Sequence, residues 1–393
     1  MIITTDLYKK KSECCGCEMC AQVCPKHIIQ MKEDNEGFLY PIAFNPKECI
    51  DCNRCLRVCP LKNSYSGPTA KENYGGSSLD KDEVKLSSSG ALASLISQQF
   101  IKDGGFVYGV EYLPDFTGAH YKRCTNLDDL NSLKGSKYCQ SIKTGVHAQL
   151  RKDLKEHKVL FIGLPCDVHA IKLCFPNRSN LFTMALICHG PTSPTVQKDF
   201  VKILKETYQN DVTSFTVRGK ITGWKPYYIL ADFTNDSRYK TTFSDSIYGI
   251  AFSILKRPSC GNCKFKLHNS SSNIDSDLIL GDFHGIKKSS PVYNTWGNSQ
   301  ISILSEKGSS LLNKIREYTS LTPISLYDAL HYNKALGETI KPPVTRNLFA
   351  KVLISDGLET ACNLKAVKAM RKVKEIRKSF IKILLHIVHF IKK

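Results

Sequence analysis

Residues 14–25 have the sequence CCGCEMCAQVCP, and residues 49–60 have the sequence CIDCNRCLRVCP. Both contain the pattern C-x2-C-x2-C-x3-C-P, and the second copy begins 35 residues after the first. Three thiolates at this short spacing let a tight loop surround one four-iron cubane, while the fourth cysteine reaches the cubane held by the other loop. The duplicated pattern therefore predicts two iron–sulfur clusters in one small unit.

The spacing assigns four ligands to each predicted cluster. The first cysteine set is Cys14, Cys17, Cys20 and Cys59, and the second cysteine set is Cys49, Cys52, Cys55 and Cys24. Between the two loops, residues 27–31 and 38–42 are expected to pair as short strands around a polar turn. Residues 1–64, which hold both sets, resemble a dicluster bacterial ferredoxin.

A pair of zinc sites with four cysteines each is the alternative for this unit. Zinc sites usually take their ligands from two separated CxxC pairs, whereas three closely spaced cysteines followed by C-P are typical of a cubane. Cys15 lies beside a ligand but outside the pattern. We therefore expect Cys15 to be a free thiol.

The composition supports a globular, metal-binding protein. The 393 residues include 17 cysteines, 42% hydrophobic residues, and 55 Lys and Arg against 36 Asp and Glu, a formal charge of +19. The 23% of charged and 9% of aromatic residues exclude wholesale disorder, a collagen and a membrane protein with many spans. Nine of the cysteines lie before residue 60, and residues 1–15 contain no apolar signal-peptide core. We therefore expect a cytoplasmic protein whose cysteines bind metal.

The rest of the chain is predicted to be α/β (α+β), with a mixed sheet. Residues 65–85 are polar and carry Gly and Ser, so we expect a linker there. Residues 86–325 form the next unit, because apolar runs typical of buried strands alternate with helical patterns. The expected strands are 105–112, 158–163, 181–188, 213–217, 227–233, 277–282 and 300–304, and the expected helices are 91–103, 144–156, 167–174, 194–208 and 308–319.

Four further cysteines follow the predicted strands. Cys166 follows the strand 158–163, Cys188 ends the next strand, and Cys260 and Cys263 form a CxxC in a basic loop. Open α/β sheets bind ligands beyond the carboxyl ends of their strands, so these four residues, the third cysteine set, are sufficient for another cubane. The pattern alone also fits zinc, a redox pair or small buried residues. No G-x-G-x-x-G follows a strand, so a standard dinucleotide site is not supported.

Six ordered blocks of this unit resemble the coenzyme F420 hydrogenase/dehydrogenase beta-subunit family. The blocks are SSSGALASLISQQFIKDGG (87–105), LKGSKYCQS (133–141), VLFIGLPCDVHAI (159–171), ALICHG (185–190), CGNCKF (260–265) and DLILGDFHG (277–285), the last followed by NTWGNSQISILSEKGSSLL (294–312). Together with the ferredoxin unit, the resemblance extends over roughly residues 10–320. It implies that the third cysteine set binds a [4Fe-4S] cluster and that the same domain binds FAD.

The resemblance also implies the residues that contact the flavin. These are Ser89, Gly90, Gly135, Ser136, Lys137, Tyr138, Gly281 and Asp282. Ser89 and Gly90 stand where a helix is expected to begin, and backbone N–H groups at such a position bind phosphate. The same two residues also fit a plain helix cap, and Lys137 also fits a solvated surface lysine. No catalytic residue is assigned.

The function implied by the resemblance is that of an iron–sulfur flavoprotein oxidoreductase. Such a protein passes electrons between a two-electron donor, namely F420H2, NAD(P)H or an organic substrate, and [4Fe-4S] clusters. The archaeal F420 subunits usually lack a fused ferredoxin, so the donor stays open here. Similar fusions often lie near genes of surface polysaccharide synthesis, which makes such a pathway one expected setting. The alternative, from a different class, is a non-catalytic electron-transfer or scaffold subunit of a larger complex.

The last part of the chain, residues 326–393, is expected to be a helical extension with a basic amphipathic tail. Residues 363–393 contain ten Lys or Arg and one Glu, or +9 of the total charge. The apolar run 379–391 is too short to span a bilayer, so the tail is expected to lie on an anionic membrane at the inner face or to dock on a partner. A helix packed on its own core is the alternative. Nucleic acid is not expected, because no reader motif is present.

Overall fold

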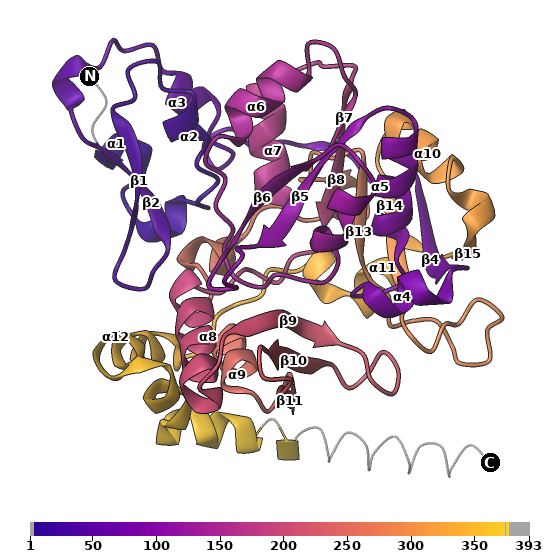
Figure 1. Cartoon of the computed structure of the whole chain (residues 1–393). Coiled ribbons are helices and arrows are strands. Elements are labelled where there is room, and N and C mark those ends of the chain that lie inside the picture. Colours follow the sequence, from indigo (N-terminus) through magenta and orange to yellow (C-terminus); the bar gives the residue numbers. More distant parts are fainter. Residues whose placement is uncertain (1–3, 374, 377–393) are drawn as a thin grey trace.

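The computed structural model describes residues 4–373 and 375–376, and Figure 1 shows their arrangement. The N-terminal unit contains α1 (Thr4–Leu7), α2 (Met19–Gln22), β1 (Ile29–Glu33), β2 (Leu39–Ala43) and α3 (Arg54–Arg57). The two strands are antiparallel, with Ile29 opposite Ala43, so the predicted hairpin is confirmed. Its turn is closed by the carboxylate of Asp34, which accepts hydrogen bonds from the backbone N–H groups of Glu36 and Phe38 at 3.0 and 2.9 Å.

An eight-stranded mixed sheet forms the centre of the molecule. Its strands, in spatial order, are β15 (Thr319–Pro323), β4 (Glu72–Ser78), β14 (Ser299–Ile303), β13 (Leu278–Asp282), β8 (Leu181–Leu186), β7 (Val159–Gly163), β5 (Phe106–Tyr112) and β6 (Ala119–Cys124). The four strands from β13 to β5 are mutually parallel, and the outer strands pair antiparallel. The predicted mixed α/β fold is confirmed, and β4, β6 and β15 add to the strands that were expected.

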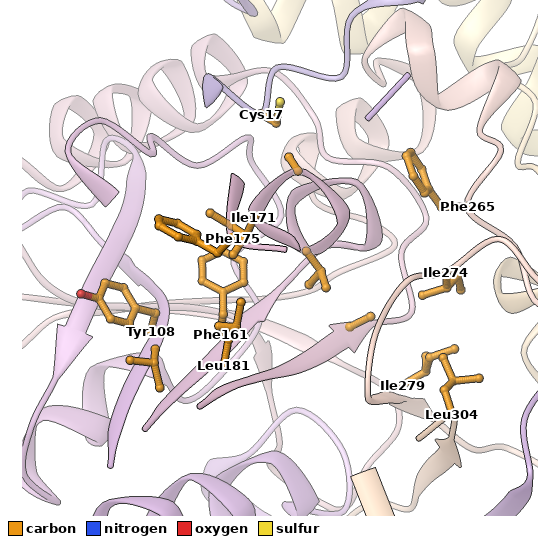
Figure 2. Packing of buried hydrophobic residues seen from close by; sticks show 14 of the residues in the cluster. Cys17, Tyr108, Phe161, Ile171, Phe175, Leu181, Phe265, Ile274, Ile279 and Leu304 are labelled. Atoms are coloured by element: carbon orange, nitrogen blue, oxygen red, sulfur yellow. The ribbon is translucent and has the colours of Figure 1, made fainter. Parts of the chain in front are cut away.

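Helices cover both faces of this sheet because its central strands are apolar on both sides. In β7, Phe161 packs in one core and Leu160 in the other, and all five residues of the strand are buried. One face is covered by α6 (Val146–Asp153) and α7 (Pro165–Cys174), and the other by α5 (Leu92–Lys102) and α10 (Glu306–Asn313). Figure 2 shows the first core, where Phe161 lies beside Ile171 and Phe175 of the α7 segment.

A second, smaller sheet has a core of its own, which the sequence did not indicate. It contains β9 (Val212–Gly219), β10 (Tyr228–Phe233) and β11 (Arg238–Thr242), and it packs with α8 (Pro194–Tyr208), α9 (Ile247–Ile254) and α12 (Arg346–Asn363). Val367, within the predicted tail, is fully buried in this core. Residues 363–371 therefore pack on the protein itself, and the guanidinium of Arg371 lies 3.3 Å from Asp245. The part of the tail from residue 377 onward lies outside the described residues.

The predicted linker 65–85 is corrected by the structure. This segment contains β3 (Gly67–Pro68), which pairs with β12 (Ser271–Ser272), and then β4 and α4 (Lys81–Leu86). The polar composition of β4 hid its position in the sheet. A Cβ at Gly76 would lie 1.9 Å from the backbone oxygen of Ser320 in β15, so a glycine is needed for close strand contact.

The described part of the extension after the sheet contains α11 (Leu326–Tyr332) followed by α12. Within the described ranges, no helix combines the length and the apolarity that crossing a bilayer requires.

Candidate functional site

The site is built at one edge of the sheet, where three neighbouring parallel strands end. β7, β8 and β13 are adjacent and parallel, so their carboxyl ends point the same way. Cys166 lies in the first turn of α7 just after β7, Cys188 lies two residues after β8, and Asp282 is the last residue of β13. The chain thereby brings segments from distant parts of the sequence to one edge.

All four members of the third cysteine set line a single pocket at this edge. Its empty volume is about 840 Å³, including the space at its mouth. Burial, together with the neighbouring Cys263, raises the pKa of the Cys188 thiol to about 11, although the backbone N–H of Gly190 opposes the shift. Gly190, with φ +90°, allows the chain to turn close to Cys260, because a Cβ there would lie 3.1 Å from its Sγ. Four soft sulfur donors around one cavity fit a [4Fe-4S] cluster.

The second cysteine set lines a smaller pocket with an empty volume of about 340 Å³. All four of its thiols, Cys24, Cys49, Cys52 and Cys55, are among the lining residues. This pocket faces outward beside Ile50, which is 57% exposed, and it is bordered by the exposed basic residues Lys26 and Arg54. The structure thus gathers the four cysteines that the repeat assigns to one cluster.

The first cysteine set is gathered against the large sheet. Burial raises the pKa of Cys20 well above its usual range, and the nearby charges of Cys14 and Cys59 raise it further. Cys17 packs in the core of the sheet's α7 face. Within residues 4–373 and 375–376, no three His, Cys, Asp or Glu side chains converge on a single ion position. Cubane ligands each bind a different iron, and the three thiol sets have the chemistry that this group requires.

The ferredoxin unit docks on the α/β domain through the loop of the first set. Glu18 is only 2% exposed, and it accepts hydrogen bonds from Lys143 N at 3.0 Å and from Thr144 Oγ1 at 3.3 Å. Burial raises the pKa of Glu18, and the nearby Lys143 opposes that shift. Cys15, expected to be an unrelated free thiol, lines the third-set pocket. The first set and the third set therefore lie on either side of one interface.

Several predicted flavin contacts converge beside this pocket. Ser88 Oγ lies 2.8 Å from Ser136 Oγ. The buried Arg218 donates to Tyr138 Oη at 2.9 Å and to Asp282 Oδ2 at 3.0 Å. The segments 87–90, 135–138 and 281–282 are thus joined through polar contacts. Tyr138 also stacks on Phe252, with ring centroids 4.4 Å apart.

Three further predicted flavin contacts, Ser89, Gly90 and Lys137, are also bonded to other groups of the protein. The backbone N–H of Gly90 donates to Ser299 Oγ at 2.8 Å, and Ser89 Oγ lies 2.8 Å from the same atom. Lys137 Nζ donates to the carbonyl oxygens of Ser132 and Lys134, both at 2.8 Å. Burial lowers the pKa of Lys137 to about 7. In this structure the lysine therefore organises its own loop.

Sequence reasoning missed the basic residues of the second sheet that reach this site. Lys220 Nζ donates to the carbonyl oxygens of Val84 and Ser89 at 2.6 and 3.0 Å, and burial, followed by the charge of Arg218, lowers its pKa to about 7. Trp224 packs against His284 with ring centroids 4.6 Å apart. Basic residues near a strand end resemble surface residues in a sequence, and only the packing of the second sheet on the first reveals them.

Comparison with known proteins agrees with both parts of this arrangement. Residues 156–326 match the family model for the C terminus of the coenzyme F420 hydrogenase/dehydrogenase beta subunit, and residues 13–63 match that of the 4Fe-4S dicluster domain. The chain joins these two domains. The first match contains the entire third cysteine set, and the second contains the first and second sets. The expected resemblance is confirmed.

A solved structure is similar to this chain at low identity. It is a xenon derivative of the F420-reducing [NiFe] hydrogenase complex from Methanosarcina barkeri, with 17% identity, covering 80% of this chain and 94% of that chain at a TM-score of 0.46. No curated protein matches the chain.

The two domains indicate an electron-transfer oxidoreductase that binds iron–sulfur clusters. Its sulfur donors lie in three sets. The first and third sets lie on opposite sides of the interface between the two domains.

Proposed function

We propose that this chain is a flavin- and [4Fe-4S]-dependent oxidoreductase that passes electrons between a two-electron donor and one-electron carriers. When bound, FAD exchanges electron pairs with the donor and single electrons with the clusters. The donor is proposed to be F420H2, NAD(P)H or an organic substrate, in a surface polysaccharide pathway. Both of these details rest on the family resemblance.

One observation carries the proposal: a residue of the ferredoxin loop lines the same pocket as the third cysteine set. Cys15 comes from the loop that holds the first set, while Cys166 and Cys188 come from the segments that follow β7 and β8 of the large sheet. A third cluster held there would lie next to the docked ferredoxin unit. This arrangement supports a continuous path for electrons between the two domains.

The polar contacts beside the pocket support flavin binding. Arg218, only 8% exposed, offers fixed positive charge next to the predicted contact Asp282. Lys220 adds a second basic side chain within the same group, and a bound phosphate would favour its protonated form. Buried cations with backbone and hydroxyl partners are suited to hold the phosphates of a dinucleotide.

Cofactor content tests the proposal directly. Protein purified without oxygen should contain about twelve irons per chain, four for each of three cubanes, together with non-covalent FAD. The Cys260→Ser variant should lose about four irons and keep the EPR signals of the ferredoxin clusters, because their ligands all lie before residue 60. Cys362→Ser is the matched control, since Cys362 is buried in the core of the second sheet and should leave the iron content unchanged.

The outcomes separate the alternatives. Iron without flavin would favour the non-catalytic electron-transfer subunit. Zinc in place of iron would contradict both interpretations. About eight irons in the unmodified protein would remove the third cluster.

The partner on the outer side is proposed to be an acidic one-electron carrier protein. The second cysteine set opens beside exposed Ile50 and Arg54, and Lys47 and Arg57 are exposed nearby. The exposed acidic residues Glu48 and Asp51 lie on the same rim, where the basic residues outnumber them. A small apolar centre with a rim of net positive charge is suited to transient docking of a negatively charged redox protein.

Contact with an anionic membrane is proposed for the end of the chain. Residues 377–393, which lie outside the described residues, contain five Lys or Arg and no acidic residue. Basic residues near an anionic leaflet contribute about 1 kcal/mol each before screening. A chain ending after Ile376 keeps the buried Val367 and should lose binding to anionic vesicles at low salt, which full-length protein should show. Equal binding by both forms would contradict the proposal.

A further inference from the structure

Arg257 links the third cysteine set to the first. Its backbone lies three residues before Cys260, at the start of the turn Pro258–Asn262. Its guanidinium reaches into the ferredoxin unit, where Nε donates to Cys14 O at 2.8 Å and Nη2 lies 3.5 Å from Cys14 Sγ. The same residue therefore touches a predicted ligand of one cluster while its own loop carries ligands of another.

The guanidinium is held in place by several neighbours. Nη1 donates to Gln140 Oε1 at 2.8 Å, and Nη2 also donates to Leu39 O at 2.8 Å. The centroid of the Tyr40 ring lies 4.1 Å from the guanidinium carbon. Arg257 is 1% exposed, so this geometry is fixed by packing from both domains.

The guanidinium of Arg257 forms no ion pair with a carboxylate among the described residues, although a buried guanidinium stays protonated. The buried carboxylate of Glu18 is close enough for the charge of Arg257 to act on its pKa, but the structure describes no ion pair between them. A buried charge without a counter-charge in contact with it is costly. The group in contact with Arg257 that becomes anionic on metal binding is the Cys14 thiol, whose Sγ lies 3.5 Å from Nη2.

We propose that Arg257 is a positioning residue that seats the first cysteine set against the third and raises the reduction potential of the cluster that the first set binds. This inference rests on the proposed function, because it requires an iron–sulfur cluster at the first set. Reduction adds one electron and one negative charge there, and the positive guanidinium with its N–H···S contact stabilises that charge. Hydrogen bonds to the sulfurs and local charge are known determinants of cluster potential.

Arg346 offers a matched control. It is also buried, at 9% exposure, and it also fastens the ferredoxin unit to the α/β domain. Its guanidinium, however, pairs with Glu36, with Nη1 3.0 Å from Oε1 and Nη2 2.5 Å from Oε2, and donates to Lys256 O at 3.0 Å. Arg346 thus has its own counter-charge and its described hydrogen bonds reach no cysteine.

The experiment is an EPR-monitored redox titration of the complete protein. The signal of each ferredoxin cluster is first assigned by its loss in Cys14→Ser or Cys49→Ser. Arg257→Gln should shift the oxidised-to-reduced ratio of the first cluster at least tenfold toward oxidised, equivalent to about 59 mV for one electron. The second cluster should keep its potential. Arg346→Gln should shift neither cluster.

The results decide between this role and a merely structural one. An unchanged first-cluster potential in Arg257→Gln, with iron retained, would overturn the inference. If Arg257→Gln loses iron, Arg257→Lys decides, because lysine keeps the charge but not the planar fork. A first-cluster potential in Arg257→Lys that lies below that of the unmodified protein by less than the tenfold shift expected for Arg257→Gln supports the role. An unchanged first-cluster potential in Arg257→Lys overturns it. A first-cluster shift in Arg346→Gln equal to that in Arg257→Gln would indicate general undocking and would also overturn it. Absence of iron from unmodified protein would instead defeat the proposed function itself.

Discussion

The two cysteine loops of the ferredoxin unit have equivalent backbones and different surroundings. Gly16 and Asp51 occupy the same position of the repeat, and both are left-handed, with φ +71° and +50°. Glu18 and Asn53 are also equivalent, with φ +65° and +55°. Yet Glu18 is 2% exposed and bonded to the α/β domain, whereas Asn53 is exposed. The repeat therefore determines the conformation of the loop, and docking determines its environment.

The same contrast applies at the position after the first cysteine. Cys15 lines the third-set pocket, while its equivalent, Ile50, is 57% exposed at the outer surface. A duplicated motif has thus acquired an inner copy that faces the α/β domain and an outer copy that faces solvent. An electron path through this unit would use the inner copy to meet the domain and the outer copy to meet a partner.

Replacing equivalent ligands should produce the largest difference between the two copies. Cys14→Ser and Cys49→Ser should each remove about four irons, because each breaks one cubane. Only Cys14→Ser should also lower the melting temperature substantially, since it removes the thiolate in contact with the buried Arg257 and disturbs the interface. Iron analysis and calorimetry measure both effects. Equal melting temperatures would contradict the contrast between the inner and outer copies.

The grouping of the cysteines was accessible from the sequence, since their spacing reflects local loop geometry. Members of each predicted set lie together, including Cys24 and Cys59, which cross to the other loop. The parallel strands were also predictable, because a strand such as 159–163 buried on both faces is continuously apolar. These features depend on residues that are near one another in the sequence, or on a clear pattern of apolar residues along a strand.

The features that could not be predicted from the sequence depend on long-range packing. β4 was predicted to be a linker because its Gly and Ser residues carry no apolar pattern, although they let β15 approach closely. Arg257 and Arg218 are buried by contacts with distant segments, at sequence separations of 243 and 64 residues. In a single sequence, a charged residue is interpreted as a surface residue by default. The buried contacts of Arg257 and Arg218 therefore become visible only in the folded structure.

Exchanging the residue at the Gly16 position should test why the inner copy needs a glycine. Asp is accepted at the equivalent position of the outer copy, so the backbone conformation itself allows a side chain. A Cβ at Gly16 would lie 2.3 Å from Gln140 Nε2 and 2.7 Å from Arg257 Nη1. Gly16→Asp should therefore lower the free energy of unfolding by about 1–3 kcal/mol through overpacking, a loss that pairing of the new carboxylate with Arg257 reduces only in part. Chemical unfolding measures this loss, and a stable variant would show that the interface is loosely packed.

A charge reversal at the outer copy should affect exchange with a partner and leave the fold unchanged. Arg54 is exposed beside the second cysteine set, so Arg54→Glu should slow electron exchange with an acidic one-electron carrier about tenfold at low salt. Arg178→Glu, an exposed change at the start of the β8 segment, is the control and should have little effect. Stopped-flow rates at low and high salt measure this, because screening should remove the difference. A rate loss that persists at high salt would argue against electrostatic docking.

The smallest effect is expected from Asp51→Gly, the exchange reciprocal to that at Gly16. Asp51 is exposed, and its Oδ1 lies 3.6 Å from Cys49 Sγ within its own loop. Glycine accepts a left-handed φ without strain but adds freedom to the unfolded chain, so the two effects oppose each other. Iron content and melting temperature should therefore stay close to those of the unmodified protein. A loss as large as that of Gly16→Asp would show that the outer loop is as constrained as the inner one, and that the contrast between the two copies does not come from docking.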